Sequence, residues 1–170
     1  MTSRLVATLA AFAVLTVCAA PTSAGPASAE GDPAMNGTFI VTENGEWAKT
    51  NDVYRDEAVV ISTWTVTSSC DTPIDCNGHV DSDQGWSADI STSSGLWFLK
   101  REVPNWERCS DGTTATGQQV YRFYPTDAEG FQAPGSPIWS GEIITTGPSG
   151  ACGINRSLVI RMPLTLIKTR

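Results

Sequence analysis

The sequence predicts an all-β domain: an antiparallel meander of about eight strands, for which an up-and-down barrel is favoured over a sandwich. From Asn36 onward the chain is a succession of short runs rich in Thr, Val, Ile and aromatic residues, each ended by Gly, Pro, Asn or Asp. Turns of hairpin length, such as 43–45 and 93–95, separate some of these runs. Long segments with the 3.6-residue periodicity of a helix do not occur among them. These three observations together define the predicted fold class.

The expected strands cover residues 38–42, 58–67, 79–81, 86–90, 96–101, 119–124, 138–146 and 158–168. In the last of them Leu164 and Leu166 share one face, and Thr165 lies on the other. The same apolar face includes Leu158, Ile160 and Met162. Pro163 lacks a backbone N–H, so we expect an edge position or a bulge there.

The second strand carries apolar residues on both of its faces. Val60 and Trp64 point one way, whereas Val59 and Ile61 point the other way. This pattern predicts a strand that is buried on both sides. Residues 46–58 are the best place for a single helical turn.

The first 29 residues have the layout of a secretory signal peptide. Arg4 is followed by an apolar stretch over residues 5–20, and the small residues Ala27-Ser28-Ala29 form a cleavage site before Glu30. An earlier alternative site is Thr22-Ser23-Ala24. We therefore expect a signal peptide over 1–29, a flexible leader over 30–36 and a single secreted β domain over 37–170.

The expected localisation is extracellular, by free secretion. A lipid anchor on Cys18 is the alternative, but Val17 precedes that cysteine where the lipobox needs a small residue. After the signal the chain has no apolar run of about 18 residues, so no membrane span is expected. The mature chain keeps 10 basic side chains against 18 acidic ones, a balance of about −8. This scattered negative charge argues against nucleic acid and anionic membranes as partners.

Removal of the signal leaves an even number of cysteines. Cys70, Cys76, Cys109 and Cys152 then form two disulfides in one of three connectivities. We favour Cys70–Cys76, which brackets a short turn-forming loop with Pro73, together with Cys109–Cys152. The competing interpretation is a zinc site, but these spacings contain no close C-x-x-C pair.

One short motif could hold a metal ion. His79, Asp81 and Asp83 alternate along an expected strand, so an imidazole and two carboxylates would share a face. The alternative is a purely structural role, in which a polar strand end leads into an ordinary turn. His79 is the one histidine of the chain, so a hydrolase with a Ser-His-Asp arrangement would also have to use it. No G-x-S-x-G motif accompanies it, and no cofactor is expected.

Six tryptophans are many for a domain of this size. Most of them are expected in the core, because they are the largest apolar groups available. Trp86 and Trp106 lie near expected turns, and together with Trp97 they are the subset that we expect at a binding surface, where exposed rings stack on sugars or apolar ligands.

Several motifs of the chain are shared with a known group of proteins. They are Gly85-Trp86-Ser87-Ala88-Asp89, Gly95-Leu96-Trp97, Trp106-x-x-Cys109-x-Asp111-Gly112 and Gly150-Ala151-Cys152-Gly153. Over about residues 63–166 the chain resembles small secreted proteins of mycobacteria and related actinobacteria whose function is not established. The resemblance implies export and the same two disulfides. A weaker likeness to lipocalin-type barrels rests on the strand count and on the start Asn36-Gly37-Thr38-Phe39, which lacks the Gly-x-Trp signature.

These observations predict a non-catalytic binding or envelope-interaction module, with a core large enough for a single domain. Its partner would be a small molecule, a glycan or a protein at the cell envelope, and the protein is expected to be a monomer. One alternative is a protein inhibitor that presents the Cys70–Cys76 loop. Another is a small hydrolase that uses His79 and nearby carboxylates. An apolar cavity would favour ligand binding, whereas a filled core with a projecting loop would favour inhibition.

Overall fold

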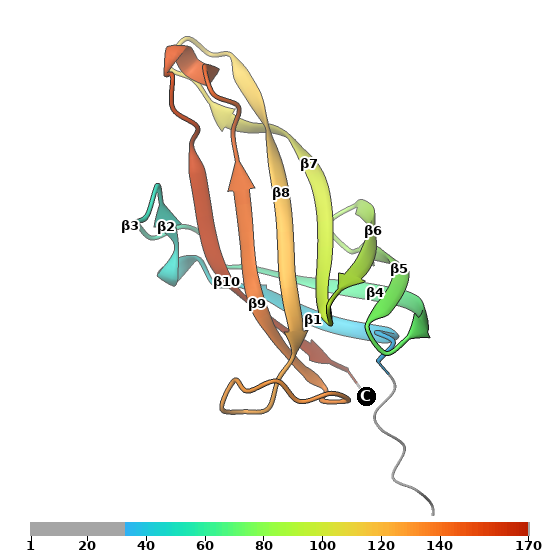
Figure 1. The fold of residues 1–170 in the computed structure, drawn as a ribbon. Helices are drawn as coiled ribbons and strands as arrows, with labels where there is room; N and C mark the ends of the chain where they lie inside the picture. Colours follow the sequence, from blue (N-terminus) through green and yellow to red (C-terminus); the bar gives the residue numbers. More distant parts are fainter. Residues whose placement is uncertain (1–32, 170) are drawn as a thin grey trace, which may run out of the picture.

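The protein folds as a closed antiparallel β-barrel of eight strands (Figure 1). The computed structural model describes residues 33–169. The barrel strands are β1 (Gly37–Glu43), β4 (Val60–Thr72), β5 (Asp75–Ser82), β6 (Trp86–Ser93), β7 (Leu96–Arg108), β8 (Thr114–Pro125), β9 (Ile138–Thr146) and β10 (Val159–Lys168). Each strand from β4 to β10 pairs with its neighbour along the chain, and β1 pairs with both β4 and β10. The predicted up-and-down barrel is thereby confirmed, and each of the eight expected strands has its counterpart.

A small hairpin is attached to the outside of this barrel. After the 3-10 turn η1 (Gly45–Trp47), strand β2 (Lys49–Thr50) pairs with β3 (Val53–Tyr54) and with β10. The Asn44 side chain accepts from the backbone N–H of Glu46 and so begins the turn. The helical turn expected within 46–58 is thus limited to η1, which begins at Gly45, and residues 49–54 form the hairpin.

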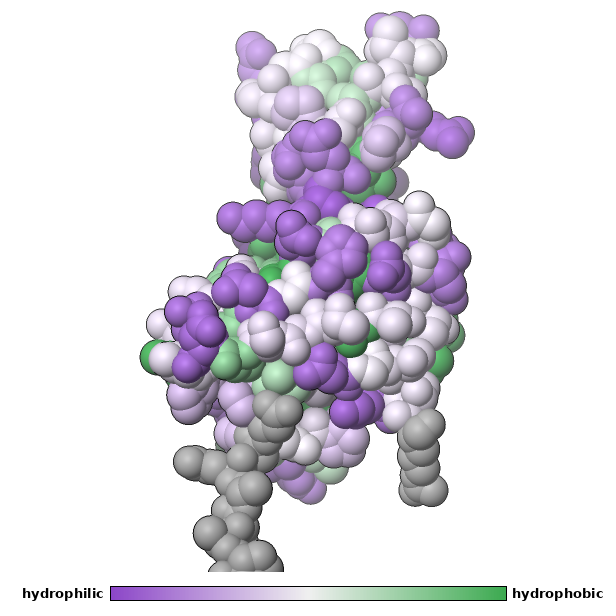
Figure 2. Space-filling model, turned by 90° about the vertical axis from the view of Figure 1, so that its right-hand side faces the viewer, coloured by the Kyte–Doolittle hydropathy of each residue, from purple (hydrophilic) through white to green (hydrophobic). Residues whose placement is uncertain are grey.

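Four strands extend beyond the barrel at one end (Figure 1). β7 runs to Arg108, well past the expected end at residue 101, and β8 begins at Thr114. Together with β9 and β10 they form a narrow sheet extension that stands above the wider barrel, with hydrophilic side chains where the two meet (Figure 2). The second 3-10 turn, η2 (Ala151–Gly153), lies at the tip of this extension (Figure 1).

The interior of the barrel is packed with aromatic and aliphatic side chains. Trp64 lies at its centre, with ring centroids 5.1 Å from Tyr121, 5.4 Å from Trp86 and 6.3 Å from Phe123, all edge to face. The other buried apolar residues include Phe39, Val41, Val66, Val80, Ile90, Leu99, Trp139, Ile143, Leu164 and Leu166. The predicted inward face of the last strand is confirmed by Leu164 and Leu166.

The second barrel strand is buried on only one face, which corrects the expectation from its sequence. Val59 is 43% exposed and Ile61 is 63% exposed, whereas Trp64 is fully buried. The wall of this barrel is one sheet thick, so only the inward residues of a strand enter the core. Val and Ile at outward positions fit the pleated surface of a strand without being covered.

Pro163 lies where β10 changes partners. Leu164 pairs with Glu43 at the end of β1, and β10 next meets β2 at Arg161. Pro163 lies in the gap between the β1–β10 and β2–β10 pairings. Its carbonyl accepts from the backbone N–H of Asn44, and because the N and C=O of one residue point to the same side of an antiparallel strand, the proline nitrogen also faces this gap. The expected edge position or bulge is therefore wrong: β10 pairs with β9 throughout without a register shift, and Pro163 instead lies in a gap between the β1 and β2 ladders.

Both predicted disulfides are present. Cys70–Cys76 closes the hairpin between β4 and β5, and Cys76 packs into the core. Cys109–Cys152 joins the β7 end of the sheet extension to η2. One disulfide therefore belongs to the barrel and the other to the extension.

The N-terminal segments are described only in part. The expected signal peptide, with Cys18, and residues 30–32 of the expected leader lie outside the described residues. Met35, in the remainder of that leader, is 1% exposed, and its backbone N–H and C=O both bond to the Ser68 hydroxyl. Within residues 33–169, no helix has the length and hydropathy needed to cross a membrane.

Candidate functional site at the barrel mouth

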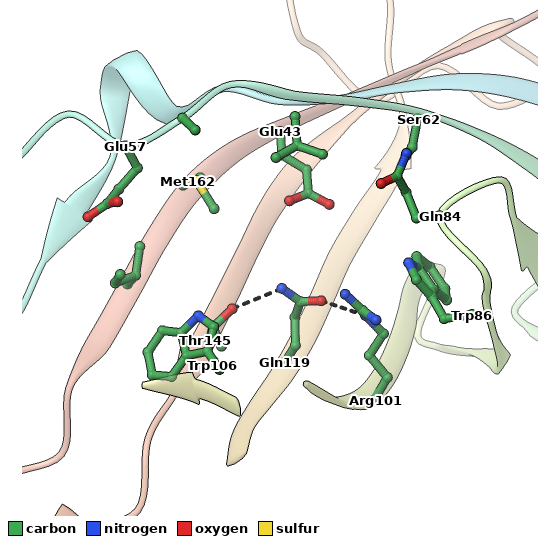
Figure 3. Close-up of a pocket in the computed structure, with 13 residues that line it drawn as sticks. Glu43, Glu57, Ser62, Gln84, Trp86, Arg101, Trp106, Gln119, Thr145 and Met162 are labelled. Carbon is green, nitrogen blue, oxygen red and sulfur yellow. Dashed lines mark hydrogen bonds between the residues drawn. The ribbon is translucent and has the colours of Figure 1, made fainter. Parts of the chain in front are cut away.

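A cavity of about 430 Å³ opens at the end of the barrel from which the sheet extension rises (Figure 3). At this end β1 stops, β4 begins and the β5–β6 turn closes. The cavity is lined by Glu43, Glu57, Ala58, Val60, Ser62, Gln84, Trp86, Arg101, Trp106, Gln119, Thr145, Ile160 and Met162. Its volume lies in the range of small-molecule sites, about 300–1,000 Å³.

The floor of this cavity is a connected layer of polar side chains. The Tyr121 hydroxyl donates to Glu43 Oε1 at 2.9 Å and also lies 3.0 Å from Gln119 Oε1. Gln119 Oε1 accepts from Arg101 Nε at 2.6 Å, and Gln119 Nε2 donates to Thr145 Oγ1 at 3.0 Å (Figure 3). The layer separates the apolar core from the open mouth, and its hydrogen bonds fix the side chains that face the cavity.

Glu43 is the carboxyl group in this layer and is 8% exposed. Burial raises its pKa from the ordinary value of 4.5, although the Tyr121 hydrogen bond and the positive charge of Arg101 oppose that shift. Burial, and then the neighbouring Glu43 charge, also raise the pKa of Tyr121. Tyr121 has a single hydroxyl proton for two acceptors, Glu43 and Gln119. The hydroxyl can therefore donate to only one of these two oxygens at a time.

Arg101 is held at the cavity wall by two contacts. Its Nε donates to Gln119, and its guanidinium group lies 4.4 Å from the centroid of the Trp86 ring. Among the described side chains, Arg101 forms no ion pair with a carboxylate. The close-up shows the end of its guanidinium group directed into the same hollow as Glu43 (Figure 3). A fixed cation with unused donors therefore faces the cavity.

Two tryptophans form opposite parts of the wall. Trp86 stacks on Tyr121 with ring centroids 6.1 Å apart and carries Arg101 on its face. Trp106 comes from the sheet extension and lies close over Gly117, where a Cβ atom would be 2.8 Å from its ring. A side chain at Gly117 would displace that ring, so glycine is needed there for the position of Trp106.

The three tryptophans expected at a contact surface separate in the structure. Trp86 and Trp106 line the cavity. Trp97 is 2% exposed and packs against Trp139 in the core, so it is not available to a ligand at the surface. It is the second residue of β7 and points inward, into the core.

His79 and its expected partners lie on the outside of the barrel. His79 Nδ1 is 2.8 Å from Asp89 on β6, and His79 Nε2 is 3.8 Å from Asp81. Asp83 instead lies in the turn after β5, where its carboxylate accepts from the Gln84 amide at 3.3 Å. Across residues 33–169, no group of three or more His, Cys, Asp or Glu side chains is placed to hold a metal ion. The strand alternation thus brings His79 near Asp81, and Asp89 is the neighbour that the sequence did not indicate.

The loop inside the Cys70–Cys76 disulfide is short and tied to the barrel. Thr92 Oγ1 accepts from the Cys76 backbone N–H at 2.7 Å and donates to the Ile74 carbonyl at 2.8 Å. Ile74 itself is exposed at the tip. The loop is therefore a fixed hairpin end, as expected from its turn chemistry.

The polar floor was not predicted from the sequence, although a signal for it exists. Gln119 continues the inward face of Tyr121 and Phe123, and Arg101 continues that of Leu99. A polar residue at an inward position of a strand marks the end of an apolar core layer or a buried site. That signal requires the inward face to be assigned first, and the strand pairing provides this assignment.

Comparison with known proteins gives a relationship at the level of fold. No protein-family model and no curated protein sequence matches the chain. The fold is similar to a solved structure of the sensor domain of PknI from Mycobacterium tuberculosis, in its monomer form. The TM-score is 0.57 with 15% sequence identity, and the match covers 80% of this chain and 88% of that chain. The chain therefore shares its barrel architecture with a mycobacterial sensor domain.

Proposed function

We propose that the protein is a non-catalytic extracellular binding module that holds a small amphipathic molecule in the mouth of its barrel. The cavity of about 430 Å³ is the observation that carries this proposal. It combines two tryptophan rings and aliphatic groups with a hydrogen-bonded polar floor, which is the composition expected of a small-molecule site.

The extracellular assignment rests on the two disulfides and on the secretory layout of residues 1–29. Disulfides persist in oxidising compartments, and the mature chain has an even number of cysteines, all of them paired. The structural neighbour is a sensor domain, which is compatible with ligand recognition by this barrel architecture. The cavity favours ligand binding over an inhibitor that presents the Cys70–Cys76 loop.

A titration with N-phenyl-1-naphthylamine tests this function, because this neutral dye fluoresces when it enters an apolar site. We expect saturable binding to the mature protein. Trp106→Ala removes a cavity wall and is expected to weaken binding about tenfold, in line with the loss of one large aromatic contact.

Trp47→Ala is the matched control, because Trp47 is 61% exposed at the end of η1 and does not line the cavity. Its affinity for the dye should equal that of the wild type. Failure of the wild type to bind the dye, or an equal loss in both variants, would contradict binding in the barrel mouth.

A further inference from the structure

We infer that the ligand is an organic anion, whose acidic group pairs with Arg101 while its apolar body lies between Trp106 and Met162. This inference rests on the proposed function and specifies the ligand class for the same cavity. It follows from the placement of one cation and two carboxyl groups around a partly apolar hollow (Figure 3).

Arg101 is already oriented as an anion receptor. Its Nε is used by Gln119 and its flat face by Trp86, so the side chain is fixed without a counter-ion. The terminal nitrogens keep donors in the fork geometry that matches a carboxylate. Binding an anion there would cost little side-chain entropy, because the guanidinium group is held before the ligand arrives.

Neither carboxyl group of the cavity forms an ion pair with this cation, although the charge of Arg101 acts on the pKa of Glu43. Glu43 already accepts from Tyr121, and its burial favours the neutral form of the carboxyl group. Glu57 lies across the cavity from Arg101, beside Met162 (Figure 3). An acidic group bound at Arg101 would therefore face a cation that has no carboxylate in an ion pair with it.

The rest of the lining suits an amphipathic body. Met162 and the Trp106 ring offer apolar surface on the side of the cavity away from Arg101 (Figure 3). Ile160 is a further apolar residue of the lining. Ser62 and Gln84 lie near the Arg101 end and provide additional polar groups (Figure 3). The cavity thus has a polar, cationic end and a more apolar end, as an organic carboxylate requires.

The test compares two probes that share a ring and differ in charge: 1-naphthaleneacetate and neutral 1-naphthaleneethanol, titrated calorimetrically at neutral pH. The wild type is expected to bind the carboxylate at least about tenfold more tightly, as for a charge-assisted hydrogen bond. Arg101→Gln should remove this preference, so that the carboxylate binds no more tightly than the alcohol. Arg101→Lys should keep part of the preference, because it retains the charge but not the planar fork.

Lys100→Gln is the matched control, because it removes the same charge from the adjacent, outward position of β7. It should bind both probes as the wild type does. Equal wild-type affinities for the two probes, or a preference that survives in Arg101→Gln, would overturn the anion assignment. If N-phenyl-1-naphthylamine still binds in that case, the proposed function stands without this inference; if no probe binds, both are rejected.

Discussion

The two halves of the barrel interior are lined by the same strands but by different kinds of side chain. In the closed half, Trp64, Phe123 and Trp139 pack edge to face and fill the space between the walls. At the mouth, Arg101 and Gln119 face a cavity instead. The barrel therefore combines a packed core and a binding-type hollow within one sheet.

On five of the barrel strands, the change from the packed half to the mouth occurs between two inward residues that are two positions apart. Each pair has an inward apolar or aromatic residue followed, two positions away, by a polar residue of the mouth. The pairs are Val41 and Glu43, Trp64 and Ser62, Leu99 and Arg101, Tyr121 and Gln119, and Ile143 and Thr145. We expect the apolar residue of each pair to contribute mainly to the free energy of unfolding. The polar residue should contribute mainly to ligand affinity.

The largest expected effect comes from the closed half. Phe123→Ala removes a fully buried ring beside Trp64 and should lower the free energy of unfolding by about 3–5 kcal/mol. Ile61→Ala, on the outer wall, should change it by less than about 1 kcal/mol. Urea unfolding followed by circular dichroism measures both values. Equal losses in the two variants would show that the barrel interior is not the core.

The next effect separates the barrel from the sheet extension. Cys109–Cys152 closes a loop across 43 residues, and Cys70–Cys76 closes one across six. The chain-entropy model gives about 4 kcal/mol for the longer loop and about 2.4 kcal/mol for the shorter one. We therefore expect the Cys109→Ser/Cys152→Ser variant to be less stable than Cys70→Ser/Cys76→Ser in the same urea titration. The reverse order would mean that the extension contributes little to the cooperative fold.

The smallest effect concerns the polar floor and depends on pH. Because the pKa of Glu43 is raised, the folded state holds this proton more tightly than the unfolded state does. The contribution of this proton to the stability of the folded state is complete below pH 4.5, and it is lost as the pH rises through the raised pKa of Glu43. Glu43→Gln has no such proton and should raise the melting temperature at about pH 7.5 while changing it little at about pH 4. A variant with the same shift at both pH values would contradict the assigned cause.

Much of the fold follows from local sequence patterns. Runs of β-branched and aromatic residues between turn residues predict the eight strands, and the even cysteine count predicts the disulfides. The sheet extension is less apparent, because residues 102–108 are largely polar and lack the alternation of a half-buried strand. Their strand structure depends on pairing with β8, which is a tertiary contact.

The candidate site could be predicted only in part. Trp86 and Trp106 were expected at a binding surface from their positions near turns. Arg101 and Glu43 were not expected there, because a charged residue in a strand normally faces solvent. Only the closure of the barrel shows that these two side chains point to the same interior space.

Tryptophan indole resonances provide the most direct test of the division between a filled core and a binding mouth. The protein has six tryptophans, and a ¹H–¹⁵N spectrum resolves one indole signal for each. On addition of 1-naphthaleneethanol, we predict that the Trp86 and Trp106 signals shift, whereas those of Trp47, Trp97 and Trp139 stay in place. Shifts confined to Trp47, or no shift at Trp86 and Trp106, would contradict a ligand site in the mouth of the barrel.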